Sequence, residues 1–119
     1  MMTILNQEDK LLIVHRRLFE GDVSRYFIGE VDASNDILVQ VTGYTWVNSA
    51  LKTSFFKKEE ARTKIFSLSS GTFIVYKLKR DLDMKSIEIT VKDDTRTILQ
   101  DKNGEVMDIT ERHHHLPTA

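Results

Sequence analysis

A strict alternation of polar and apolar side chains runs through Ser86-Ile87-Glu88-Ile89-Thr90-Val91-Lys92. This two-residue period places Ile87, Ile89 and Val91 on one face of an extended strand and the polar side chains on the other. These three residues are also β-branched, and such side chains pack well on a half-buried pleated surface. The segment therefore predicts a β-strand with one face against a hydrophobic core.

Similar bursts recur along the chain, separated by residues that favour turns. We expect strands at residues 10–19, 24–31, 37–47, 52–58, 63–68, 72–79, 86–92, 96–100 and 105–110. Gly43 predicts a bulge, a bend or a close approach of another backbone within its strand. Asn103-Gly104 is typical of a two-residue hairpin turn, so the strands beside it should pair antiparallel.

Residues 52–58 form the least regular of these segments. Ser54 offers an alternative, because it is a good N-cap for a short helix reaching Arg62. However, Lys57 and Lys58 would then lie in the first turn, where positive charge opposes the helix dipole. The sequence therefore favours a strand that carries Phe55 and Phe56.

Many short strands at near-regular spacing predict an all-β, single-domain antiparallel meander of about eight to ten strands. A small coiled barrel is the first expectation for its architecture, and a sandwich is the second. A chain of 119 residues fits one domain, which we place at residues 1–112. Residues 113–119 are expected to form a flexible tail. Its histidines, His113 to His115, have no rigid further ligands that would indicate a metal site.

Composition excludes several classes of protein. The formal net charge is -1, so no global positive field attracts nucleic acid or an anionic membrane surface. The chain has no cysteine, which excludes disulfides and thiolate metal sites. The longest apolar run, Leu11–Val14, is far shorter than the ~20 residues of a membrane span. The opening segment is also too short and too polar for a secretory leader, and together these features favour a cytoplasmic protein.

Cationic and aromatic residues supply the candidate ligand site. His15, Arg16 and Arg17 would form a fork for a carboxylate or phosphate, although charges on an edge strand also prevent aggregation. Tyr44 and Trp46 would be the aromatic walls of a cavity, with Arg16 or Arg17 as its polar anchor. Alternatively, the aromatic residues simply fill the core.

No arrangement of a nucleophile, a base and an acid is visible, and His15 is the only histidine before the tail. The sequence therefore predicts a non-enzymatic binding module for a small molecule or anion, with no cofactor and no metal. The alternative is a homodimeric or protein-docking subunit in which Phe55 and Phe56 form an exposed anchor. A third possibility is single-stranded nucleic-acid binding on one face of the barrel.

Several short stretches of the chain also carry a resemblance. The run from His15 to Asp22, its continuation from Arg25 to Val31, the pair Gly43-Tyr44 and the pair Thr63-Lys64 resemble a group of short uncharacterised bacterial proteins. The resemblance implies a compact antiparallel β fold. It implies no activity and supplies no functional residues.

Overall fold

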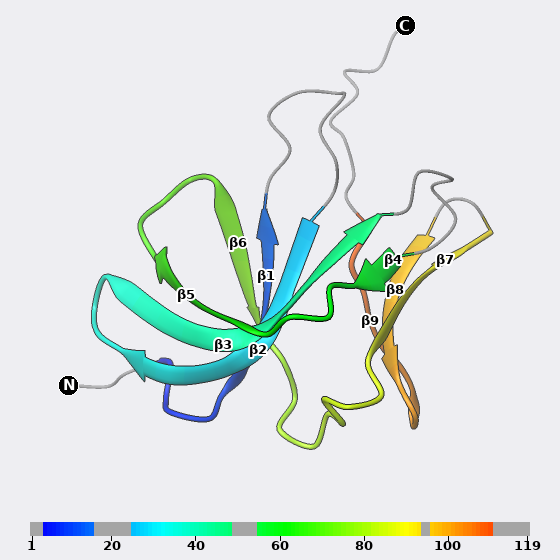
Figure 1. Ribbon diagram of the computed structural model, residues 1–119, viewed down its shortest axis with the longest axis horizontal. Helices are drawn as coiled ribbons and strands as arrows, with labels where there is room; N and C mark the ends of the chain where they lie inside the picture. Colours follow the sequence, from blue (N-terminus) through cyan, green and yellow to red (C-terminus); the bar gives the residue numbers. More distant parts are fainter. Residues whose placement is uncertain (1–3, 16–24, 49–54, 94–95, 111–119) are drawn as a thin grey trace, which may run out of the picture.

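The computed structural model describes residues 4–15, 25–48, 55–93 and 96–110. Within these ranges nine β-strands form two antiparallel sheets (Figure 1). The strands are β1 (Lys10–His15), β2 (Arg25–Ser34), β3 (Leu38–Asn48), β4 (Phe55–Lys57), β5 (Arg62–Ser67), β6 (Phe73–Lys77), β7 (Glu88–Lys92), β8 (Arg96–Asp101) and β9 (Gly104–Asp108). The all-β antiparallel prediction is confirmed. The described part of the chain contains no helical segment able to cross a membrane.

Each expected strand overlaps one observed strand, with differences at the ends. In the uncertain segment, Phe55–Lys57 is a strand paired with the end of β3, so the helical alternative is wrong there. The last hairpin pairs antiparallel as predicted, but its turn lies one residue earlier. Asp101 pairs with Gly104, and only Gly104, with a φ of 118°, has positive φ in this hairpin. Residues 16–24 and the tail at 113–119 lie outside the described residues.

The first sheet has the strand order β4-β3-β2-β1-β6, and β5 pairs with the other half of β3. Gly29 lies directly opposite Gly43 in the β2–β3 ladder. A Cβ atom on Gly43 would collide with the backbone of Ile28, so this glycine permits the expected close approach of two backbones. The bulge lies elsewhere, between Val31 and Ala33 of β2.

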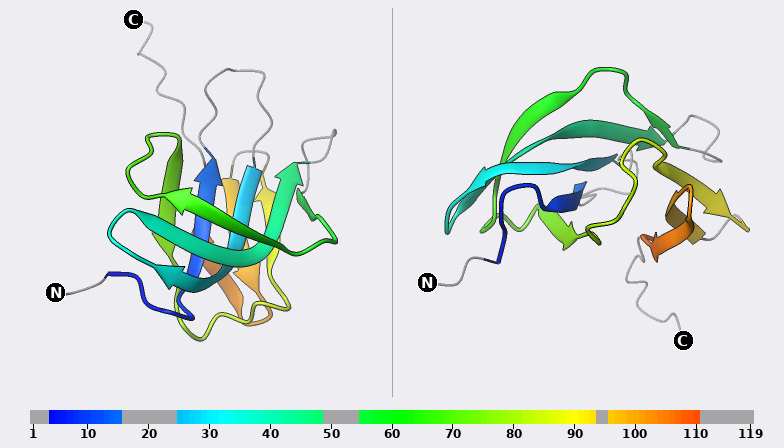
Figure 2. Two further views of the ribbon diagram at one scale, coloured as in Figure 1. Left: turned by 60° about the vertical axis from the view of Figure 1, so that its left-hand side comes forward. Right: turned by 90° about the horizontal axis from the view of Figure 1, so that it is seen from below.

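The first sheet is strongly curled (Figure 2). Hydrophobic side chains cover both of its faces. We call the concave side the inner face. Its core consists of Leu11, Ile13, Phe27, Val31, Val39, Val41 and Phe66. The opposite, outer face packs against the second sheet through a core of Leu12, Val14, Tyr26, Ile28, Trp46, Phe55, Leu78, Leu82, Ile87, Ile89, Leu99 and Ile109. Burial on both faces explains why Leu11–Val14 is an unbroken apolar run.

The second sheet has the order β7-β8-β9 and places Ile87 and Ile89 in the outer core, as the opening alternation predicts. Val91 is partly buried and packs against the same core. Among the described residues no strand pairing closes either sheet into a ring. The rings of Phe66 in β5 and Phe73 in β6 meet edge to face, with 5.2 Å between their centroids. Their strands are not paired, so barrel closure stays a prediction.

Two buried carboxylates attach peripheral segments to these sheets. Asp9 accepts a hydrogen bond from the backbone N–H of Asn6 at 2.8 Å and forms an ion pair with Lys77 at 3.3 Å. Asp101 accepts backbone hydrogen bonds from Asp83 at 3.1 Å and Asn103 at 2.8 Å. These backbone donors are the main cause of the lowered pKa of both carboxyl groups. Asp101 therefore ties the segment before β7 to the β8–β9 hairpin.

Candidate functional site

The sequence-predicted ligand residues lie on opposite faces of the first sheet. His15 pairs with Arg25 and shares the inner face with Ile13, whereas Tyr44 and Trp46 belong to the outer face. Because successive side chains of a strand point to opposite faces, one ligand cannot contact His15 and Trp46 together. Arg16 and Arg17 lie outside the described residues. The single site expected from the sequence is therefore divided into two pockets.

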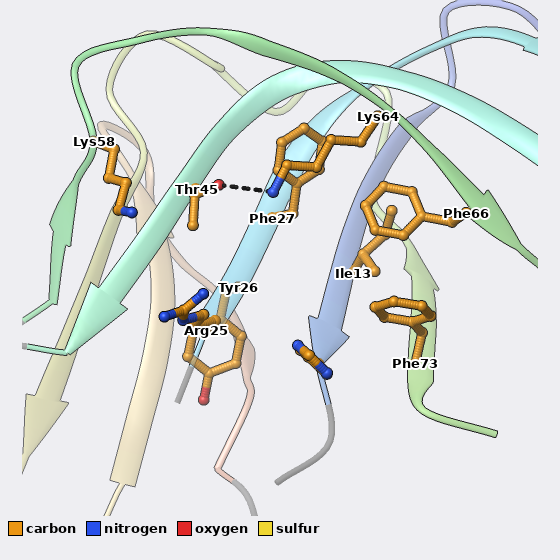
Figure 3. A pocket seen from close by; sticks show the side chains of 10 residues that line it. Ile13, Arg25, Tyr26, Phe27, Thr45, Lys58, Lys64, Phe66 and Phe73 are labelled. Carbon is orange, nitrogen blue, oxygen red and sulfur yellow. Dashed lines mark hydrogen bonds between the residues drawn. The ribbon is translucent and has the colours of Figure 1, made fainter. Parts of the chain in front are cut away.

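The inner pocket lies on the concave face, and Figure 3 shows the side chains that line it. Its volume is about 130 Å³. Its lining combines an aromatic and aliphatic floor with a cationic rim. The floor consists of Ile13, Phe27, Phe66 and Phe73, and the rim consists of His15, Arg25, Thr45, Lys58 and Lys64. Tyr26 also lines the pocket, although its ring packs in the outer core. This pairing of apolar and positively charged surface makes the inner pocket the best candidate site for an anion.

Strand register brings the cationic side chains together. Val41 pairs with Lys64 and Val39 with Phe66, so Lys64 and Phe66 point to the same inner face. The backbone N–H of Lys58 donates to the carbonyl of Thr45 at 2.9 Å, which holds Lys58 beside β3. Arg25 enters from the start of β2. Three different elements thus contribute cations to one pocket.

Lys64 extends over the pocket floor. Its Nζ donates to Oγ1 of Thr45 at 3.4 Å and lies 4.9 Å from the ring centroid of Phe27, in the range of a cation–π contact (Figure 3). Desolvation by burial lowers the pKa of Lys64, and the positive charges of Lys58, Arg25 and Arg62 lower it further. Among the described residues, the charges that shift the pKa of Lys64 are therefore all positive.

No carboxylate of the described residues forms an ion pair with Arg25, Lys58 or Lys64. Arg62, whose charge also acts on Lys64, does have a partner and pairs with Glu60 at 2.9 Å. His15 adds a ring to the rim and stacks obliquely on Phe73, with 5.2 Å between centroids. The positive charge of the inner pocket is therefore not neutralised by the described part of the chain.

The outer pocket has a volume of about 330 Å³ and does contain both predicted aromatic walls. Its apolar lining consists of Ile28, Gly43, Tyr44, Trp46, Met84 and Ile87, and its polar lining consists of Glu30, Asp32, Thr42 and Lys57. Trp46 is only 7% exposed, so most of its ring belongs to the outer core. The Nζ of Lys57 lies 4.4 Å above the ring of Tyr44. This pocket thus carries charges of both signs.

The proposed exposed anchor of Phe55 and Phe56 is wrong for Phe55. That side chain is 9% exposed and packs in the outer core, 5.2 Å from the ring of Tyr26. Phe56 is 52% exposed, because neighbouring residues of a strand face opposite sides. A single exposed ring remains of the predicted docking pair.

Sequence reasoning did not single out Arg25, Lys58 and Lys64 as one site. The only signal for them is the alternation in β5, where Lys64 and Phe66 are two residues apart and so share a face. Their common location depends on the β3–β5 register, which no local motif specifies. Within the described ranges no group of histidine, aspartate and glutamate side chains is arranged to hold a metal ion.

Comparison with known proteins adds no relative from which a role is transferable. The chain matches no family model, no curated protein and no solved structure.

Proposed function

We propose that this protein is a non-enzymatic binding module that holds a compact oxyanion, a phosphate or carboxylate group, in the inner pocket. The observation that carries the proposal is the convergence of Arg25, Lys58 and Lys64 on an aromatic floor without a carboxylate partner among the described residues. The small barrel remains part of the proposal, with β5 and β6 as the strands that close it around the pocket.

The electrostatics of the pocket support an anionic ligand. Like charges held near one another repel, and partial burial weakens the solvation that would screen them. An oxyanion among the three side chains would reverse that repulsion and accept charge-assisted hydrogen bonds, which are stronger than neutral ones. Arg25 would contribute a planar fork, whereas Lys58 and Lys64 would act as mobile point charges.

The size of the pocket limits the ligand. Sites for drug-sized molecules usually measure about 300–1,000 Å³, and the inner pocket measures about 130 Å³. A single phosphate, sulfate or short carboxylate fits this volume better than a nucleotide does. The aromatic floor excludes water from one side of the anion and thereby strengthens the remaining contacts.

Titration with inorganic phosphate tests the proposal at constant ionic strength, with chloride as the compensating salt. We expect saturable NMR shifts at Lys64 and Phe27 and a rise in thermal midpoint, because a ligand that binds only the folded state stabilises it. The R25Q and K64Q variants should lose both effects. K85Q is the matched control, since Lys85 is exposed and lies in neither pocket. Equal phosphate stabilisation of K64Q, R25Q and the unmodified protein would reject the inner pocket as the site.

A further inference from the structure

The outer pocket differs from the inner one in the charges of its lining. We infer that it is a second, independent binding site for an apolar dipeptide with free termini. The pocket offers carboxylates at one end, an ammonium at the other and an aromatic wall between them. It lies on the face of the sheet opposite the proposed oxyanion site. Binding in the two pockets can therefore be tested separately.

The acidic end is formed where β2 and β3 pair beside the bulge of β2. Glu30 pairs with Thr42, and the Oγ1 of Thr42 donates to the carboxylate of Asp32. The same Oγ1 also contacts Oγ1 of Thr63 at 2.8 Å, which fixes the threonine between two strands. Asp32 is thus held in place before any ligand arrives, and such preorganisation reduces the entropy lost on binding.

The carboxylates of this end have no cationic partner among the described residues. Lys10 pairs with Glu30 in the β1–β2 register, but its Nζ donates instead to the carbonyls of Arg80 and Leu82, both at 2.7 Å. No ion pair of the described ranges includes Glu30 or Asp32. An ammonium group from outside would therefore meet two uncompensated carboxylates.

The opposite end of the pocket is basic. Lys57 pairs with Trp46, and its Nζ reaches back to lie 4.4 Å over the ring of Tyr44. Thr42 and Tyr44 are two residues apart on the same face of β3, which corresponds to about 7 Å along a strand. An extended dipeptide separates its ammonium and carboxylate groups by a similar length. A simple amine would match only the acidic end, and Lys57 would repel it.

The wall between the charged ends accounts for the apolar side chains of the ligand. Tyr44 and Trp46 come from β3, Ile28 comes from β2, and Met84 and Ile87 come from the segment that leads into β7. The volume of about 330 Å³ lies at the lower end of the usual range for organic ligands. The site is therefore large enough for a dipeptide and too small for a longer folded segment.

The single tryptophan of the chain provides a direct readout, because Trp46 lines this pocket. We expect leucyl-phenylalanine to change Trp46 fluorescence saturably, whereas its N-acetyl form, without the ammonium, and its amide form, without the carboxylate, should each bind at least tenfold more weakly. The D32N variant should lose the preference for leucyl-phenylalanine over its N-acetyl form. K57Q should lose the preference over the amide.

Matched controls separate this proposal from the first. D36N alters an exposed carboxylate outside the pockets and should bind leucyl-phenylalanine normally. K64Q should also bind the dipeptide normally even if phosphate binding is lost, or was never present. Equal affinity of the unmodified protein for all three peptide forms, or no saturable change in Trp46 fluorescence, would overturn the inference without depending on any variant.

Discussion

The inner and outer pockets use opposite faces of the same strands and differ in charge. Among the described residues, the inner pocket has three cations, Arg25, Lys58 and Lys64, and no carboxylate in its lining, whereas the outer pocket combines Glu30 and Asp32 with Lys57. A two-residue period makes this possible, since alternate side chains of one strand serve different pockets. A sheet covered on both faces can thus carry two sites of different chemistry, whose separation depends entirely on strand register.

The largest effect is expected from Gly43, which lies opposite Gly29 in the β2–β3 ladder, and both of these strands contribute residues to both pockets. In G43A the new Cβ would collide with the backbone of Ile28, and one strand must move. We expect the free energy of unfolding to fall by roughly 4 kcal/mol or more. This is a large part of the ~5–15 kcal/mol that stabilises a typical domain. Urea unfolding measures this loss. G71A is the control, since nothing lies within 4 Å of a Cβ there. Similar unfolding midpoints for G43A and G71A would contradict the close approach of β2 and β3.

Phe55 and Phe56 distinguish the outer core from the surface next to it. F55A removes a buried ring that packs on Tyr26 and should cost about 3–5 kcal/mol. F56A alters a side chain that is 52% exposed and should cost less than about 1 kcal/mol. Denaturant unfolding of both variants gives the comparison. If F56A instead changed the sedimentation coefficient, Phe56 would lie in a contact between copies of the chain.

The sequence located the strands well because their side-chain period is local information. Ile87 and Ile89 face the core as their alternation predicts, and even the short strand with Phe55 was expected. In β2 alternate side chains still face opposite sides, but Tyr26, Phe27 and Ile28 are all buried because a core covers each face of this strand. The expectation that each strand buries only one face therefore does not account for all three residues.

The pockets were less accessible to sequence reasoning. Tyr44 and Trp46 were recognised as walls because they alternate in one strand, and the outer pocket contains both. Lys64 was missed because its approach to Phe27 depends on β3–β5 pairing across the first sheet, which no spacing along the chain reveals. The sequence analysis placed His15 and Trp46 in one ligand site because the sequence does not show that their side chains lie on opposite faces of the sheet.

Asp101 should affect the outer pocket more than the inner one, because it holds the segment that leads to Met84 and Ile87. D101N should lower the urea midpoint and weaken dipeptide binding while leaving phosphate binding intact. The backbone donors of Asp83 and Asn103 lower the pKa of Asp101 below its ordinary 3.8. A lowered pKa means that the stabilisation is present above the unfolded pKa and is lost as pH falls through the folded one. The difference in midpoint between the two proteins should thus shrink below about pH 4. A constant difference from pH 7 to pH 2 would show that the charge of Asp101 is not what holds this segment.

Lys64 should give the smallest change in stability and the clearest sign. Its pKa in the folded protein is lowered from 10.5, mainly by desolvation and then by the positive charges of Lys58 and Arg25. The protonated side chain therefore destabilises the fold below the folded pKa, and this penalty disappears as pH rises toward 10.5. At pH 7 and low salt, K64Q should melt at the same temperature as the unmodified protein or slightly above it, and this advantage should vanish at high pH. Phosphate should reverse the order at pH 7, because only the unmodified protein has the ammonium that binds it. If K64Q is less stable than the unmodified protein without any anion, Lys64 supports the fold through its contacts with Thr45 and Phe27. Repulsion between positive charges would then not distinguish the inner pocket from the outer one.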